Sequence, residues 1–101
     1  MEALLNAENA RAVISLEGRF DFSRHREFRS ACDQALGAAG VRDVEVDFGR
    51  VDYIDSSALG MLLMLRDGAR IANKTVKLVN CRGNVRQILD IANFAKLFTI
   101  G

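Results

Sequence analysis

The 101-residue sequence has no proline and only two cysteines. Without proline, its turns must depend on glycine, asparagine and aspartate. The cysteines, Cys32 and Cys81, lie far apart in the sequence and do not have the spacing of metal ligands. Both occur among apolar residues, so we expect them to pack as small hydrophobic side chains with free thiols.

An excess of charge of either sign is also missing, because 14 basic and 13 acidic residues leave a net charge of +1. No basic run is long enough to follow a phosphate backbone, which argues against a nucleic-acid partner. The apolar run at 62–65 is too short to cross a bilayer, and residues 1–6 lack the features of a secretory signal. We therefore expect a cytoplasmic protein with no direct membrane insertion.

Half of the residues are hydrophobic, and the length suffices for one core, so we expect a single domain over residues 1–101. The hydrophobic patterns alternate between the strand and the helix period. They predict strands near 4–7, 10–18, 44–48, 75–79 and 97–100, and helices near 24–36, 57–72 and 84–92, with Ser23 capping the first helix. This order predicts an α/β fold: a mixed, mainly parallel sheet of four to five strands flanked by three helices.

The junction at 51–61, Val-Asp-Tyr-Ile-Asp-Ser-Ser-Ala-Leu-Gly-Met, is the most informative segment. An apolar strand ends at Asp55, two serines follow, and an apolar helix begins at once. A helix N-terminus offers unpaired N–H groups and a positive potential, so a phosphate on Ser56 would be stabilised there. We expect Ser56 to be exposed and to accept phosphate, with Ser57 as the fallback. The alternative is that Ser56 is only an N-cap.

The predicted helix after Ser56 has more apolar surface than one core face requires. At 100° per residue, the core face comprises Ala58, Met61, Leu62, Leu65, Gly68, Ala69 and Ala72. Leu59 and Leu63 fall on the opposite, wetter side. Either the first and third helices cover both leucines, or they form an apolar patch for a protein partner beside Ser56.

Catalysis finds little support in the sequence. A serine at a strand-to-helix turn is typical of hydrolases, but the Gly-x-Ser-x-Gly motif is missing. The sole histidine, His25, is expected in the first turn of the first helix, in a solvated setting, and no second histidine is present. Asp52 and Asp55 are explained by a turn and a cap. We therefore expect no enzyme activity, no cofactor and no metal.

The segments Gly-Arg-Phe-Asp at 18–21 and Tyr-Ile-Asp-Ser-Ser-Ala-Leu-Gly at 53–60, together with Asp47, resemble the STAS domain family. More specifically, they resemble its small bacterial anti-sigma factor antagonists, and the resemblance covers nearly the whole chain. Two departures are Ala58, where many relatives have glycine, and the end at Gly101, where many relatives continue into a helix. The second departure leaves open how one sheet face is closed and which oligomeric state forms.

The resemblance implies partner switching. An unphosphorylated antagonist binds an anti-sigma factor that is also a serine kinase of the histidine-kinase-like ATPase type, which frees the sigma factor. The kinase phosphorylates the residue matching Ser56, and a metal-dependent serine phosphatase reverses this. Asp55, Asp21 and Gly60 match positions near the phosphorylation site. Other STAS domains are non-phosphorylated adaptor subunits of transporters or lipid-trafficking complexes, so that role is the alternative.

Overall fold

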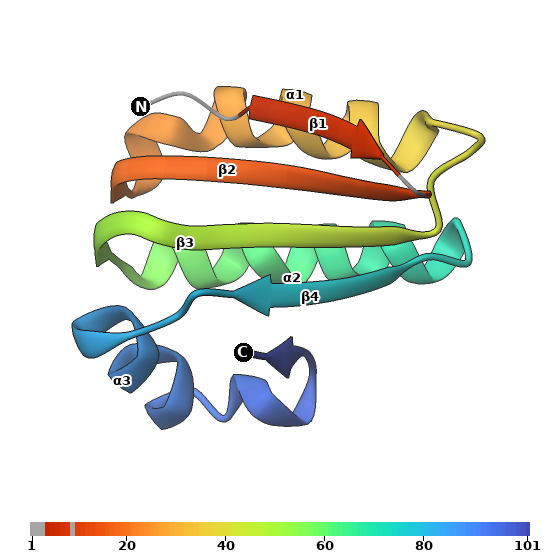
Figure 1. Ribbon diagram of the computed structural model, residues 1–101. Helices are drawn as coiled ribbons and strands as arrows, with labels where there is room; N and C mark the ends of the chain where they lie inside the picture. Colours follow the sequence, from red (N-terminus) through yellow and green to blue (C-terminus); the bar gives the residue numbers. More distant parts are fainter. Residues whose placement is uncertain (1–3, 9) are drawn as a thin grey trace.

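A five-stranded sheet carries helices on one of its faces (Figure 1). The structure is a computed structural model that describes residues 4–8 and 10–101. The strands are β1 (Leu4–Glu8), β2 (Arg11–Phe20), β3 (Asp43–Ile54), β4 (Thr75–Val79) and β5 (Thr99–Ile100). The helices are α1 (His25–Gly37), α2 (Ser56–Ile71) and α3 (Gly83–Ile91), and single 3₁₀ turns lie at Phe22–Arg24 and Phe94–Lys96.

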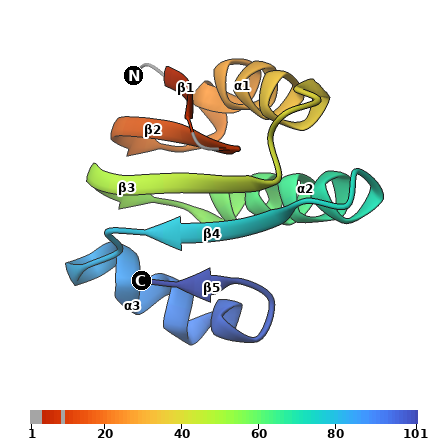
Figure 2. The ribbon, with the colours of Figure 1, turned by 45° about the vertical axis from the view of Figure 1, so that its right-hand side comes forward.

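The strands follow one another across the sheet in the order β1-β2-β3-β4-β5. β1 pairs with β2 antiparallel, and every later neighbour is parallel. The predicted α/β class, with a mixed and mainly parallel sheet, is therefore confirmed. Parallel crossovers are right-handed, and here they all advance in one direction, so they place the helices on the same face. In Figure 1, α1 and α2 both lie behind the sheet, and Figure 2 shows β5 beside β4 next to α3.

The core lies between this sheet face and the helices. Alternate residues of the central strands point into it, including Ile14 of β2 and its register partner Val46 of β3, both fully buried. α2 adds the predicted core-face residues Ala58, Met61, Leu62, Leu65 and Ala69. On the opposite sheet face, Ser15, Glu45 and Asp47 are only half-buried. This alternation is the pattern of a sheet that packs on one side.

One predicted boundary is wrong. The first helix is not capped by Ser23, because Asp21 caps a 3₁₀ turn and α1 begins only at His25. The alternating pattern at 44–48 belongs to one long strand, β3, which continues through Gly49 and Arg50 to Ile54, as expected for a strand that leads into the Asp-Ser-Ser segment. Among residues 4–8 and 10–101, no helix is long and apolar enough to cross a membrane.

Two irregularities in the pairing of β2 with β3 position that segment. The register shifts between Ser15 and Glu17 and again between Gly18 and Arg19, and at each place β3 has one extra residue. Gly18 has a φ of +76°, a backbone conformation that glycine adopts without the cost of a Cβ clash. After the second shift, Phe20 pairs with Ile54. The two strands therefore end side by side.

Candidate functional site

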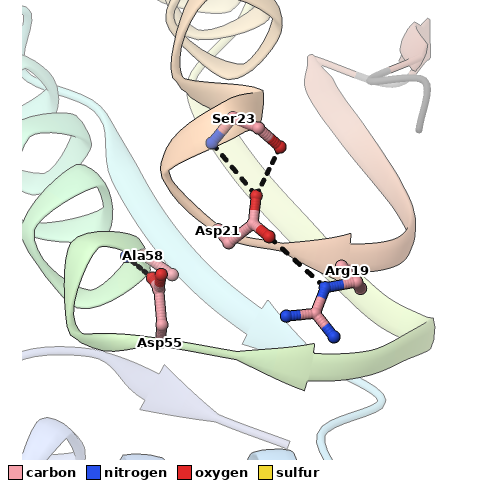
Figure 3. A network of polar contacts seen from close by, with 5 residues as sticks. All are labelled: Arg19, Asp21, Ser23, Asp55 and Ala58. Atoms are coloured by element: carbon pink, nitrogen blue, oxygen red, sulfur yellow. Dashed lines mark hydrogen bonds and ion pairs between the residues drawn. The ribbon is translucent and has the colours of Figure 1, made fainter.

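Asp55, not Ser56, caps the N-terminus of α2. The Asp55 side chain accepts a hydrogen bond from the backbone N–H of Ala58 at 2.9 Å (Figure 3), and its backbone is extended, as is usual for an N-cap. Ser56 is therefore the first helical residue, and the N-cap explanation of this serine is wrong. Ser56 is exposed, whereas Ser57 is half-buried. The cap leaves the Ser56 hydroxyl available at the positive end of the helix.

Asp21 organises the neighbouring connection between β2 and α1. Its Oδ1 accepts hydrogen bonds from the backbone N–H of Ser23 at 3.0 Å and from the Ser23 hydroxyl. Its Oδ2 is 3.4 Å from Nε of Arg19 (Figure 3). The hydroxyl of Ser23 is the main cause that lowers the pKa of Asp21, and Arg19 lowers it further. Asp21 is therefore held as a carboxylate.

The strand pairing brings Asp21 and Asp55 to the same edge of the sheet. Each follows directly after one member of the Phe20–Ile54 pair, and neighbouring strands lie about 4.8 Å apart. The sequence alone suggested that Asp21 lies near the phosphorylation site only through the family resemblance. The topology supplies a geometric reason, because two parallel strands end together and each is followed by an aspartate.

The solvent-facing side of α2 carries small residues near its start and mainly apolar residues further along. At 100° per residue, the exposed residues of α2 other than Arg70 fall within one narrow arc. We call this arc the α2 outer face, and it comprises Ser56, Gly60, Met64, Asp67 and Ile71. Met64 is 50 % exposed and Ile71 is 86 % exposed. Neither was predicted from the sequence as a surface residue, although their spacing from Ser56 could have identified them.

Leu59 and Leu63, the leucines expected at a partner interface, flank this outer face. Both are half-buried and pack against the core cluster. Arg66, on the same flank, donates a hydrogen bond from Nε to the backbone oxygen of Leu97 at 3.1 Å, which ties this side of α2 to the C-terminal segment. Only part of each leucine therefore faces solvent. Their role in partner binding stays a prediction.

A shallow apolar groove separates α2 from α1 on the other flank. It encloses about 180 Å³, and its lining includes His25, Met61 and Met64. Next to it, Phe22 is 71 % exposed and its ring stacks on that of His25 at a centroid distance of 5.9 Å. Apolar surface therefore extends from Phe22 across the groove to the α2 outer face. Exposed apolar surface of this kind is typical of protein-binding sites.

A hollow of about 630 Å³ lies elsewhere, on the sheet face opposite the helices. Its polar groups are already engaged with one another. Oδ1 of Asp47 accepts hydrogen bonds from the N–H of Gly49 at 2.8 Å and from Nδ2 of Asn80 at 3.0 Å, and Arg82 donates to the Gly49 oxygen at 2.8 Å. These bonds tie β3 to the segment after β4. They explain Asp47 as a structural residue.

Both cysteines are buried and free. Burial raises the pKa of Cys32 to about 12 and that of Cys81 to about 11, so both remain thiols at neutral pH. Over residues 4–8 and 10–101, no cluster of three or more histidine, cysteine or acidic side chains could hold a metal ion.

Comparison with known proteins agrees with this architecture. Residues 3–99 match the family model described as "Mlab, STAS domain". The chain is 46 % identical over 98 residues to the STAS-domain containing protein PA14_20770 of Pseudomonas aeruginosa, covering 97 % of this chain and 95 % of that protein. It is 31 % identical over 61 residues to BtrV of Bordetella bronchiseptica, whose name describes a candidate anti-sigma factor antagonist, covering 60 % of this chain and 53 % of BtrV.

The fold is shared with solved structures as well. The unphosphorylated form of the anti-sigma factor antagonist SpoIIAA superimposes with a TM-score of 0.76 at 20 % identity, over 98 % of this chain and 86 % of that one. Fold, chain-wide family match and the Asp-Ser-Ser junction at the start of α2 thus lead to one conclusion. The chain belongs to the STAS domain family.

Proposed function

We propose that this protein is an anti-sigma factor antagonist that acts by partner switching. When Ser56 is unmodified, the protein binds an anti-sigma factor that is also a serine kinase of the histidine-kinase-like ATPase type. Phosphorylation of Ser56 by that kinase releases it, and a metal-dependent serine phosphatase restores the binding form. The observation that carries the proposal is the exposed hydroxyl of Ser56 at the start of α2, where Asp55 already supplies the cap.

The proposed docking surface runs from Phe22 to the α2 outer face. It offers the exposed side chains of Phe22 and Met64 and the groove between them. Gly60, one turn after Ser56, faces open space, since an added Cβ there would meet nothing within 4 Å. Because glycine has no side chain, a partner can approach the helix backbone closely at this position. Ser56 lies at the edge of this surface. A group added to its hydroxyl would therefore stand between the two proteins.

Phosphate would act through charge rather than by unfolding the domain. It adds about −1.5 to −2 charges, and a helix N-terminus stabilises an anion by roughly 0.3–1 kcal/mol. Asp21 and Asp55 already make this end of α2 acidic. Like-charge contacts in an interface cost several kcal/mol, and each ~1.4 kcal/mol changes the affinity tenfold. Phosphorylation could thus reduce partner occupancy by orders of magnitude.

In this proposal the protein itself performs no catalysis. The kinase supplies the nucleotide, the metal and the base, so Ser56 needs to be accessible but not activated. The site contains no histidine adjacent in sequence to Ser56, and His25 is stacked on Phe22. What the protein contributes is a rigid surface whose charge can be changed at one point.

The experiment is a comparison of Ser56→Ala and Ser56→Asp as binding partners. The kinase is first identified by capture from native extract with Ser56→Ala as bait, and its affinity for each variant is then measured. Ser56→Ala should bind like the unmodified protein, and Ser56→Asp more weakly. Gln87→Glu, which adds the same charge at an exposed position of α3, is the matched control and should bind normally.

Equal binding of all three variants would refute the docking argument. Intact-mass measurement on protein from the native cell provides an independent check. A protein that never carries phosphoserine under any growth condition would instead be a constitutive adaptor, such as the STAS subunit of a transporter or lipid-trafficking complex.

A further inference from the structure

Arg19 is a cation held beside the acidic start of α2. In the sheet it is the register partner of Tyr53, and its guanidinium carbon lies 4.1 Å from the centre of the Tyr53 ring. Its Nε is 3.4 Å from Oδ2 of Asp21 (Figure 3). The Arg19 side chain is nevertheless 62 % exposed. It is therefore positioned by two contacts but not enclosed by them.

The other charges around this point are mainly negative. The end of β3 and the first part of α2, residues 51–65, contain aspartates but no lysine or arginine. On the β2 side, Arg24 lies 3.6 Å from Glu27, its neighbour along the helix. Arg19 is the remaining cation in residues 17–24. Arg19 is thus a positive charge at the end of β2, beside the acidic start of α2, that an anion on Ser56 would attract.

The strand register brings Arg19 within range of Ser56. Phe20 pairs with Ile54, so Arg19 precedes this pair by one residue and Ser56 follows it by two. At about 3.3 Å per residue along a strand and about 4.8 Å between strands, the two Cα atoms are separated by roughly 11 Å if both chains stay extended. An arginine and a phosphoserine can meet across a separation of this size when their side chains extend toward each other around the end of the sheet.

We propose that Arg19 changes its ion-pair partner when Ser56 is phosphorylated: its guanidinium separates from Asp21 and pairs with the phosphate on Ser56. The inference rests on the proposed function, because it concerns the modified state of the same serine. An exposed ion pair with a single contact is weak, whereas arginine binds a phosphate dianion through two charge-assisted hydrogen bonds. Asp21 tolerates the loss, because its Oδ1 keeps both hydrogen bonds from Ser23.

Two consequences follow from this exchange. Arg19 stabilises the dianionic phosphate and so keeps it fully charged at neutral pH. In addition, the exchange moves a cation away from Asp21 and leaves that carboxylate exposed at the edge of the docking surface. The modification then changes the charge at two points instead of one.

The test uses protein in which phosphoserine is incorporated directly at position 56, so that no kinase is needed. The second pKa of this phosphate is measured by ³¹P NMR for the parent sequence, Arg19→Gln and Arg19→Lys. Arg50→Gln is the matched control, since Arg50 is an exposed arginine near the end of the same sheet. Arg19→Gln should raise the phosphoserine pKa by about 0.5–1 units, Arg50→Gln by about 0.2 or less, and Arg19→Lys by an intermediate amount.

The titration must separate the phosphate from its neighbours. The charged groups on the surrounding elements are Asp21, Arg24 and His25 after β2, Asp52 within β3 and Asp55 directly after β3. Because a histidine titrates in the same range as phosphoserine, the measurement is repeated in a His25→Gln background. The difference between the parent and Arg19→Gln should persist there.

A second readout does not depend on any substitution at Arg19. The Nε–Hε resonance of Arg19 should move when phosphoserine replaces serine, because its acceptor changes from a carboxylate to a phosphate. An unchanged resonance, or a pKa shift in Arg19→Gln no larger than in Arg50→Gln, would overturn the inference. If the pKa shift and the change in the Arg19 resonance are both observed, but the partner binds the serine and phosphoserine forms equally, the proposed function fails while the role of Arg19 is still supported.

Discussion

Gly60 provides the sharpest test of whether the outer face of α2 is shaped for a partner rather than for folding. Glycine inside a helix lowers stability by roughly 0.5–1 kcal/mol relative to alanine. A Cβ added at Gly60 would meet nothing within 4 Å. Gly60→Ala should therefore raise the free energy of unfolding by about 0.5–1 kcal/mol. Nothing in the domain itself accounts for a glycine at this position.

Gly68, in the same helix, is the matched control. An added Cβ there would lie 2.7 Å from Cδ1 of Leu36, a residue of α1. The Leu36 side chain must shift to accommodate this methyl group, which offsets part of the gain in helix propensity, so Gly68→Ala should gain less stability than Gly60→Ala. Replacing Leu36 by alanine removes the clash. In that background, Gly68→Ala should become more stabilising.

Urea unfolding of the four single and double variants and their parent measures these differences directly. For a domain of this size, 1 kcal/mol corresponds to a change in Tm of about 4–8 °C, so Gly60→Ala should melt a few degrees higher. The account also requires that Gly60→Ala weaken partner binding, because its methyl group occupies the docking surface. A less stable Gly60→Ala, or one that is more stable and binds its partner unchanged, would refute the reasoning.

Three further predictions concern the start of α2, the segment after β2 and one side chain in the middle of α2. Asp55→Ala should lower the free energy of unfolding by about 1 kcal/mol through loss of the cap, whereas Ser56→Ala should change it by less than about 0.5 kcal/mol; thermal unfolding distinguishes the two. Ser23→Ala should raise the pKa of Asp21, which NMR titration of the carboxyl carbon would measure. Because the folded pKa of Asp21 is lowered, its contribution to stability is present above the unfolded value of about 3.9 and is lost as the pH falls through the folded pKa. The stability difference between wild type and Ser23→Ala should therefore shrink in acid. Leu63→Lys should lower Tm, because this side chain packs against the core, and an unchanged Tm would mark it as surface.

Most of the architecture could be predicted from the sequence, because the strand and helix periods of its hydrophobic residues are clear. The alternation along the central strands and the apolar face of the second helix correctly predicted the one-sided core. The ends of β2 and β3 were less predictable. The two register shifts depend on pairing between segments about thirty residues apart in the sequence, and a hydrophobic pattern does not report an extra residue in one strand.

The capping residues show a second limit. Asp and Ser both cap helices well, so the sequences Asp-Phe-Ser at 21–23 and Asp-Ser-Ser at 55–57 each offered more than one candidate. In both places the aspartate is the cap. The competition is decided by where each strand ends, which is a tertiary property. That outcome leaves Ser56 exposed and gives the site its accessible hydroxyl.

The most direct test of the central claim is a paired capture experiment from native extract. One bait carries serine at position 56 and the other carries phosphoserine, and bound proteins are quantified by mass spectrometry. The account predicts that a kinase of the histidine-kinase-like ATPase type is retained by the serine form and depleted at least tenfold on the phosphoserine form, about 1.4 kcal/mol of lost affinity. Identical sets of bound proteins on both baits would contradict it.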